Sequence, residues 1–456
     1  MSRTPSLVAL LLSVVALGSV SMPSLAAAGP QGSSVVRTPA EASYDVHLRS
    51  GAGGKSWRGN GSVTFTNVGT GTLPQVYLRV WSNGVLGCDP RSITVSNMQG
   101  GEVTGERLDC TEVEVTLDEP LGPADTTTLS YDLDIELPDE DDRFGFHRGL
   151  ALVGSALPIL AVHDDEGWHR VPFENLGESF YSVVADHEVT FVTPPGLDTA
   201  ASGHVTGWSE TADGRTRTTY TARRVRDFAW AAGRFRTVER PAGGVDVVVS
   251  YQPNAVGRAR ARAAAADAVA VMRSLGGAFG AYPYPEVDVV LAGFGGFGGM
   301  EYPTIVFSGP SRGTIAHELA HQWFYGLVGN DQFHEPWLDE SFASWAAREP
   351  FGPSRGCSGV SWPSVGSAIT NDMTYWATHP SQYWVVYENG PCMLANLSKR
   401  FGHDRFLRIL ARYVGRHHLG IARTEDFVTA IEVAAGRHLD GFDASAYWER
   451  WRVDPP

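Results

Sequence analysis

The sequence predicts an α+β multidomain protein, with an antiparallel β-domain in its first half and a mainly helical domain in its second half. Two observations lead to this prediction. Between residues 40 and 251, apolar and polar residues alternate in short runs that are separated by turn residues, which is the pattern of strands buried on one face. After residue 251 the sequence changes to an alanine-rich stretch and further segments with helical periodicity.

The first residues have the features of an export signal. Arg3 supplies a positive charge, residues 7–20 are apolar, and small residues lead to a cleavage site that ends at Ala28. An uncleaved membrane anchor is the alternative, but the apolar run is shorter than the roughly 20 residues that a bilayer requires. We therefore expect a signal peptide at residues 1–28, a secreted mature chain and no stable membrane insertion after signal removal.

The β-domain is expected at residues 29–250. Its clearest alternating runs are Val63 and Phe65; Val76, Leu78 and Val80; Val113, Val115 and Leu117; and Leu129, Tyr131, Leu133, Ile135 and Leu137. The second domain, at residues 251–456, begins with the alanine-rich helix and continues with the strand-like run VDVVL before further helices.

The four cysteines can pair in three ways. Short loops within one domain are the simplest arrangement, so we predict the disulfides Cys88–Cys110 and Cys357–Cys392, which an oxidising compartment permits. The same cysteines are poorly placed as metal ligands because no C-x-x-C pair occurs.

The net charge of −15 excludes some partners. A surface of this charge repels nucleic acid and anionic membranes. The sequence indicates no obligate protein partner.

The strongest chemical signal is the segment TIAHELAHQWFYG. His317 and His321 are four residues apart, so on a helix their imidazoles share one face and can bind one metal ion. Glu318 would lie beside the metal, where it could take a proton from a water molecule. A catalytic zinc needs a third protein ligand, and Glu340, with eighteen residues between it and His321, lies in a second helical segment.

The segment HELAHQWFYGLVGNDQFHEPWLDESFA resembles the gluzincin metallopeptidases of the aminopeptidase N family. The resemblance implies a thermolysin-like catalytic domain with a small mixed sheet and one zinc ion per chain, bound by His317, His321 and Glu340, with Glu318 as the general base. His334 and Glu335 match no ligand of the family, so we interpret them as structural or surface residues.

The family also has a tyrosine in a YxKG segment, which holds the oxyanion of the reaction. Here the matching segment is VVYENGPCML, so Tyr387 takes that role by resemblance and Asn389 replaces the usual lysine. Tyr383 is the rival, but no glycine follows it at the right offset.

The stretch FGGFGGMEYP raises two interpretations. Its G-x-G-x-x-G spacing is that of a dinucleotide loop, but the residues that follow are strand-like and do not open a helix. It is instead similar to the GxMEN segment of the family, which implies that Glu301 binds the substrate amine and that Gly298, Gly299 and Met300 contact the peptide backbone. Tyr302 departs from the family's asparagine, and a plain flexible loop remains an alternative.

The large C-terminal helical domain of the family is absent, as is its arginine- and proline-rich segment, so we expect a short, more open form. We predict a secreted zinc aminopeptidase that cleaves the N-terminal peptide bond. The alternatives are a zinc endopeptidase on the same core and a secreted binding protein with a structural zinc site.

Overall fold

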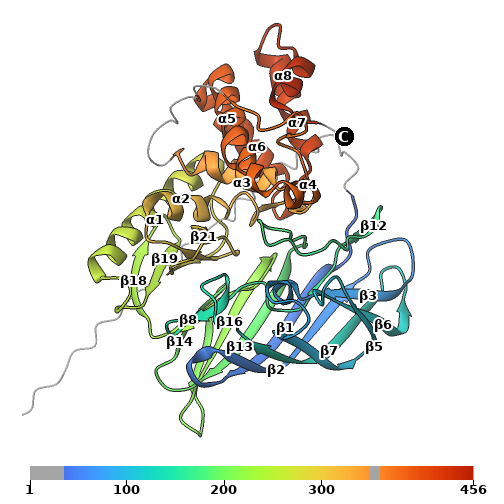
Figure 1. Cartoon of the computed structure of the whole chain (residues 1–456), viewed down its shortest axis with the longest axis vertical. Helices are drawn as coiled ribbons and strands as arrows, with labels where there is room; N and C mark the ends of the chain where they lie inside the picture. Colours follow the sequence, from blue (N-terminus) through green and yellow to red (C-terminus); the bar gives the residue numbers. More distant parts are fainter. Residues whose placement is uncertain (1–34, 350–356, 358–359, 455–456) are drawn as a thin grey trace, which may run out of the picture. The chain divides into compact units, whose positions relative to one another are not determined.

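The computed structural model describes residues 35–349, 357 and 360–454 (Figure 1). From Val36 onward the chain forms one compact unit. A β-rich part is followed by a helical part with a small mixed sheet, which confirms the predicted fold class. The predicted signal peptide, residues 1–28, lies outside the described residues.

The largest sheet has seven strands in the order β15-β16-β13-β1-β2-β7-β4 (Figure 1). Neighbouring strands are antiparallel, except that β1 and β13 run parallel. The alternation seen in the sequence is realised in β7, where Leu129, Tyr131, Leu133 and Ile135 are buried. The strands are β1 (Ala40–Ser50), β2 (Ser56–Thr66), β4 (Ile93–Gln99), β7 (Thr126–Glu136), β13 (Ala185–Thr193), β15 (His204–Glu210) and β16 (Thr216–Val225).

Two four-stranded sheets and a short hairpin complete this part of the chain. The sheet orders are β10-β3-β6-β5 and β14-β17-β9-β8, and the hairpin is β11-β12. The disulfide Cys88–Cys110 is formed, as predicted. The strands are β3 (Leu73–Arg79), β5 (Gly101–Arg107), β6 (Glu112–Leu121), β8 (Phe144–His147), β9 (Leu150–Val153), β10 (Ile159–Leu160), β11 (His163–Asp164), β12 (Gly167–Trp168), β14 (Asp198–Ala201) and β17 (Trp230–Gly233).

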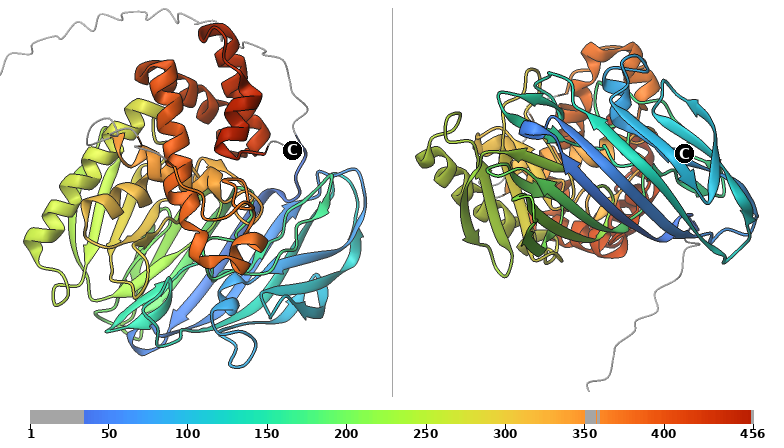
Figure 2. Two further views of the ribbon diagram at one scale, coloured as in Figure 1. Left: turned by 45° about the horizontal axis from the view of Figure 1, so that its top comes forward. Right: turned by 90° about the horizontal axis from the view of Figure 1, so that it is seen from below.

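A five-stranded mixed sheet, in the order β18-β19-β20-β22-β21, begins the helical part (Figure 2). Its three inner strands are parallel and its two edge pairs are antiparallel. Strands from both sides of residue 250 share this sheet, and the domain boundary at that residue stays a prediction. The strands are β18 (Arg236–Pro241), β19 (Asp246–Tyr251), β20 (Glu286–Leu291), β21 (Gly299–Met300) and β22 (Ile305–Ser308).

In the part of the chain that the structure describes, eight α-helices follow or interrupt this sheet. The first packs against β18, β19 and the second helix, and half of its buried residues are alanines at helical spacing. A short parallel pair joins β23 (Val328–Gly329) to β24 (Gly420–Ile421). The helices are α1 (Arg258–Phe279), α2 (Arg312–Ala320), α3 (Trp337–Ala346), α4 (Met373–Thr378), α5 (Trp384–Phe401), α6 (His403–Arg416), α7 (Thr424–His438) and α8 (Ala444–Trp451).

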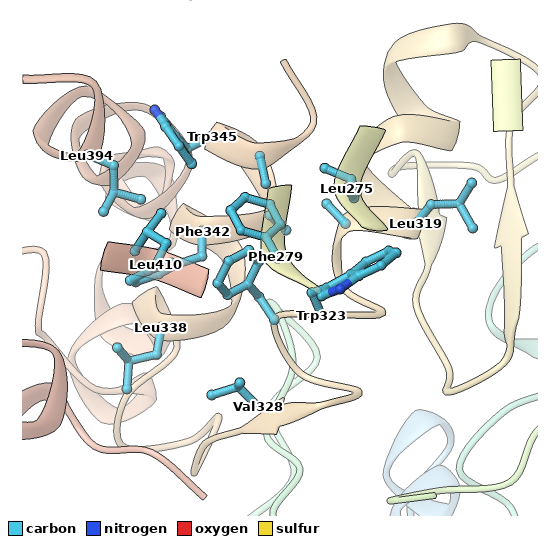
Figure 3. Close-up of a cluster of buried hydrophobic side chains, with 14 of the residues drawn as sticks. Leu275, Phe279, Leu319, Trp323, Val328, Leu338, Phe342, Trp345, Leu394 and Leu410 are labelled. Carbon is cyan, nitrogen blue, oxygen red and sulfur yellow. The ribbon is translucent and has the colours of Figure 1, made fainter. Parts of the chain in front are cut away.

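The core of the helical part fixes the helix that follows the zinc motif. Leu338, Phe342 and Trp345 of α3 are buried in this cluster together with Phe279 and Trp323 (Figure 3). These three α3 residues lie at i, i+4 and i+7, so one face of α3 is anchored and the opposite face is left for other contacts. The predicted disulfide Cys357–Cys392 is also formed. Within the described ranges, none of the helices has the length and apolarity that a bilayer crossing requires.

Candidate metal centre and active-site cleft

Helix α2 carries the two histidines of the motif. Its N-cap is Ser311, whose hydroxyl accepts a hydrogen bond from the backbone N–H of Thr314. Ile315 and Leu319 are buried in the core, whereas His317 and Glu318 line a cleft. His321 is the C-cap of α2, one turn beyond His317.

Helix α3 brings the third predicted ligand to the same place. Glu340 and Ser344, four residues apart, face the cleft opposite the anchored side of α3. The Ser344 hydroxyl lies 3.4 Å from Nδ1 of His317. This contact leaves Nε2 of His317 directed toward Glu340, at 3.1 Å from its Oε2.

Three ligand atoms converge at the candidate metal centre. Nε2 of His317 lies 3.1 Å from Nε2 of His321 and 3.1 Å from Oε2 of Glu340, and His321 Nε2 lies 3.5 Å from the same carboxylate oxygen. Tetrahedral zinc, with bonds of about 2.0–2.2 Å, separates its ligand atoms by about 3.3–3.6 Å. The two-histidine, one-carboxylate donor set and its spacing therefore fit a zinc ion with an open position.

Asp339 holds one of these histidines and was missed by the sequence analysis. Its Oδ1 accepts a short hydrogen bond from Nδ1 of His321, and its Oδ2 accepts one from the side-chain amide of Gln332. Both carboxylate and imidazole are buried. A carboxylate behind a ligating histidine fixes the ring and its tautomer. In the sequence, the only indication of this role was that Asp339 directly precedes the predicted ligand Glu340.

Glu318 lies beside the metal centre. Its side chain is buried, and burial raises the pKa of its carboxyl to about 8, with His321 opposing the shift. Gly299 makes this position possible: a Cβ there would lie 2.7 Å from the Glu318 carboxyl carbon and 2.5 Å from the carbonyl oxygen of Phe307. Only glycine lets β21 pass so close to the carboxyl group.

Glu301 and Glu178 add two buried carboxyl groups to the cleft wall. A carboxylate oxygen of Glu301 lies within 4.8 Å of a ring nitrogen of His321. Arg143 donates to Oε1 of Glu178 at 3.0 Å, while Oε2 of Glu178 has no hydrogen-bond partner among the described residues. Burial raises the pKa of both carboxyls well above the usual range. Nearby carboxyl groups add to the rise: Glu301 raises the pKa of Glu178, and Asp339, Glu340 and Glu318 raise that of Glu301. Glu178 was not identified from the sequence because no motif marks it.

In the glycine-rich stretch, the glycines line the cleft, whereas the side chains of Met300 and Tyr302 are buried. Gly298 and Gly299 line the cleft. The side chain of Met300 is buried in a hydrophobic cluster with Phe307 and Ala292, so only its backbone is available to a peptide. Tyr302, where the family has asparagine, is buried against Gly154 and Phe307.

Tyr387 lines the cleft, with its ring centroid 6.1 Å from that of His317. Gly390, one turn later in α5, explains its approach: a Cβ at this position would lie 1.9 Å from the Ser341 hydroxyl of α3. That hydroxyl donates to the carbonyl of Val386 at 2.6 Å. Tyr383, the rival tyrosine, packs edge-on behind Tyr387 and is absent from the described lining of the cleft.

Three further residues have structural contacts. The side-chain amide of Asn389, in the usual lysine position, donates to the carbonyl of Ser361 at 3.0 Å. Glu335 accepts a hydrogen bond of 2.6 Å from the backbone N–H of Thr424, the first residue of α7. His334 lies 2.8 Å from Asp331. The structure places neither His334 nor Glu335 with the three converging ligands.

The cleft has a volume of about 1150 Å³. Its lining includes two of the three candidate ligands, His317 and Glu340, together with Glu178, Glu301 and Tyr387. This volume slightly exceeds the roughly 300–1,000 Å³ that is typical of small-molecule pockets.

Comparison with known proteins agrees with this arrangement. Residues 310–375 match the model of the peptidase family M1 domain. Aminopeptidase N of Streptomyces lividans is 32% identical over 149 residues, which cover 28% of this chain and 17% of that protein. Aminopeptidase M1-B of Oryza sativa subsp. japonica is 27% identical over 210 residues, 38% of this chain and 23% of that protein. The matches thus span less than a quarter of these relatives.

Solved structures show the same fold along most of the chain. An M1 zinc metallopeptidase from Deinococcus radiodurans aligns with a TM-score of 0.62 at 20% identity, covering 91% of this chain and 94% of that one. A mutant of an M1 zinc metallopeptidase from the same organism, bound to a Tyr-Ser-Ala substrate, aligns with a TM-score of 0.63 at 22% identity and the same coverage.

The fold is similar to that of the M1 zinc metallopeptidases, and the converging ligand atoms fit a zinc ion. The part of the chain that matches the model of the peptidase family M1 domain, residues 310–375, contains His317, His321 and Glu340.

Proposed function

We propose that this chain is a secreted zinc-dependent aminopeptidase that hydrolyses the N-terminal peptide bond of peptides. The observation that carries the proposal is the pair of buried carboxyl groups, Glu178 and Glu301, in the wall of the cleft next to the metal centre. Burying carboxylates is costly unless a cation partners them. Arg143 donates to Glu178 at 3.0 Å and lies 3.8 Å from Asp142, but it makes no ion pair with Glu301 among the described residues. Glu301 is therefore left to partner the α-ammonium group of a substrate, which would favour the ionised form of this carboxyl.

The residues of the cleft then have separate tasks. Zinc held by His317, His321 and Glu340 would supply a Lewis acid that polarises the scissile carbonyl and acidifies water. Glu318 takes the proton from the attacking water and passes it to the leaving amine. The hydroxyl of Tyr387 donates a hydrogen bond to the carbonyl oxygen as negative charge develops there.

The edge strand β21 supports the same orientation of substrate. It pairs with β22 on one side, and Gly298 and Gly299 line the cleft without side chains. An extended peptide can lie along such an edge as an added strand. With its amine held by Glu301 and Glu178, its first peptide bond would face Glu318. Among the relatives, the Deinococcus radiodurans mutant bound to Tyr-Ser-Ala supports a peptide substrate.

Export is part of the proposal. The apolar segment at residues 7–20 and the small residues up to Ala28 support a cleaved signal. The two disulfides, Cys88–Cys110 and Cys357–Cys392, support an oxidising compartment.

One experiment tests the whole proposal. The full chain is expressed in a secreting host, the protein is collected from the medium, and its N-terminus is sequenced and expected near Gly29. Aminoacyl p-nitroanilides and their N-acetylated forms are then compared, with and without a chelator. We expect chelator-sensitive hydrolysis of the free-amine substrates only. Cleavage of blocked substrates would instead support an endopeptidase, and no cleavage by the zinc-loaded protein would support a binding protein.

The variant Glu301→Gln refines this test. Loss of a charged hydrogen bond of about 2–3 kcal/mol should lower kcat/KM for free-amine substrates about 30- to 150-fold. Glu140→Gln, an exposed glutamate at the outer part of the cleft, serves as the matched control and should change kcat/KM less than threefold. Equal losses in the two variants would remove Glu301 from amine recognition.

A further inference from the structure

A second group of metal-ligating side chains lies outside the cleft. It consists of His169, which directly follows β12, and of Asp331 and His334, which lie between β23 and α3. Their candidate ligand atoms all lie within 4.8 Å of one another. Oδ2 of Asp331 is 2.8 Å from Nδ1 of His334 and 3.5 Å from Nδ1 of His169. None of these three residues belongs to the described lining of the cleft.

The ring of His169 is held between two carboxylates. Its Nε2 lies 2.9 Å from Oδ1 of Asp164, whose side chain is fully buried, and its Nδ1 faces Asp331. A neutral imidazole carries one N–H and one lone pair. If the N–H points to Asp164, the lone pair on Nδ1 faces a carboxylate oxygen. The lone pair and the carboxylate oxygen repel each other. The repulsion is removed only if Nδ1 carries a second proton or if a cation lies between Nδ1 and Asp331.

Asp331 is oriented for the same role. Its Oδ1 accepts hydrogen bonds from the backbone N–H groups of Phe333 and His334, at 3.1 and 3.2 Å. This leaves Oδ2 directed at the two histidines.

We propose that His169, Asp331 and His334 form a second binding site for a divalent metal ion of the zinc type. Two imidazoles and one carboxylate are a donor set that such ions prefer. Asp164 stands behind His169 as Asp339 stands behind His321 at the first centre, the carboxylate–histidine arrangement that orients metal ligands. The side chain of His334 is 48% exposed, which opens the site to ions from solvent and leaves room for water ligands.

A metal ion here would connect two parts of the chain. His169 follows the β11-β12 hairpin, whereas Asp331 and His334 belong to the connection between the zinc-motif helix and α3. The neighbour of Asp331, Gln332, donates to Asp339, which in turn holds His321. The ion would therefore fix the connection that carries the support of a catalytic ligand, without itself taking part in the reaction.

The experiment measures metal content and does not depend on peptidase activity. Metal-depleted protein is titrated with Zn²⁺ at pH 8 by calorimetry, and bound zinc is counted by mass spectrometry after gel filtration. We expect two equivalents for the unmodified chain. His334→Ala should retain one equivalent or bind the second at least tenfold more weakly. His147→Ala, which removes an exposed histidine, should retain two.

A complementary variant separates the two centres. His317→Ala should lose the first equivalent and keep the second, and the double variant His317→Ala/His334→Ala should lose both. Circular dichroism checks that each variant is folded, and His334→Gln replaces any His334→Ala protein that is not. One equivalent in the unmodified chain, unchanged by His334→Ala, overturns the proposal and leaves a cluster that shares protons. Two equivalents that survive His334→Ala also overturn it.

Discussion

At the scale of single residues, the position of Tyr387 depends on a neighbour that has no side chain. Gly390 lets α5 lie against the Ser341 hydroxyl of α3, and Tyr387 then projects into the cleft near His317. Tyr383 lies behind it with its hydroxyl buried. Of the two tyrosines, Tyr387 is therefore the one that we propose as the donor to a substrate carbonyl.

The variant Tyr387→Phe tests this assignment. Removing one directed donor to a developing oxyanion costs about 2.7–4 kcal/mol, so we expect kcat to fall about 100- to 1000-fold while KM changes little. Zinc content, measured by mass spectrometry, should be unchanged because Tyr387 is not among the three converging ligands. Tyr383→Phe is the control and should retain kcat within threefold. A Tyr387→Phe enzyme with normal kcat would show that another group holds the oxyanion.

Sequence alone could predict the residues whose chemistry is encoded in local spacing. The interval between His317 and His321 implies a shared face on a helix, and the converging ligand atoms agree with that expectation. Glu178 and Asp331 could not be predicted in this way. Their importance comes from neighbours that are distant in the chain, such as Arg143 for Glu178 and His169 for Asp331.

At the scale of elements, the buried strand β13 contains a histidine in a hydrophobic environment. His187 is buried, stacks on Tyr44 of β1 with a centroid distance of 4.7 Å, and lies 5.8 Å from the ring of Phe228. Burial lowers the pKa of His187 to about 4. The imidazole is therefore neutral in the folded protein over a range in which an unfolded chain, with a pKa near 6.5, would be protonated.

This strand should make the protein sensitive to acid. The unfolded state binds more protons between pH 6.5 and about 4, so stability falls as pH decreases through this window. From pH 7 to pH 5, His187 should remove about 2 kcal/mol from the free energy of unfolding. The free energy of unfolding is measured by urea titration at pH 7 and at pH 5. Between these pH values it should fall by about 2 kcal/mol less in His187→Phe than in the unmodified chain. His47→Phe, at an exposed position, should behave like the unmodified chain, and identical losses in all three proteins would contradict the prediction.

Long elements were more predictable than short ones. The alternating runs that begin at Val63 and at Leu129 lie in β2 and β7, where one face of the strand is buried, and the alanine-rich stretch is α1. Strand β21 has two residues, Gly299 and Met300, which is too short for any period to be detected. Its pairing with β22 follows from the packing of the sheet.

At the scale of the whole molecule, the buried side chain of Arg226 connects segments far apart in the chain. Its Nε donates to the carbonyl of Tyr325 at 2.8 Å and its Nη1 to that of Ser182 at 3.0 Å, while Nη2 donates to the carbonyl of Gly420. Burial lowers the pKa of Arg226 to about 10, so it remains charged at neutral pH. The β-rich part and the helical part are joined by these bonds.

Replacing this side chain should weaken the fold as a whole. Arg226→Met leaves three carbonyl groups without their donor, and we expect a loss of about 3 kcal/mol or more in the free energy of unfolding. Urea denaturation followed by circular dichroism measures the loss. Arg223→Met is the control, because it removes an ion pair with Asp186 at the surface. It should lower the free energy of unfolding by less than about 1 kcal/mol. If the two variants are equally stable, Arg226 does not join the two parts.

The order of strands in the sheets could not be read from the sequence. The parallel pairing of β1 with β13 brings together segments more than a hundred residues apart, and hydrophobic alternation does not identify partners. The same limit applies to the second group of metal-ligating side chains, since His169 and His334 meet only after the β-rich and helical parts have packed together.

The close approaches at Gly299 and Gly390 have a consequence for judging related chains by their motifs. Adding a single methyl group at either position would collide with the Glu318 carboxyl group or the Ser341 hydroxyl, and the backbone or a functional side chain would have to move. Such a chain would still have both histidines, all the glutamates and the tyrosine. A motif search based on these residues would therefore classify it as an active peptidase. An alanine at the position of Gly299 or Gly390 would thus identify a related chain that has the motif residues but is inactive.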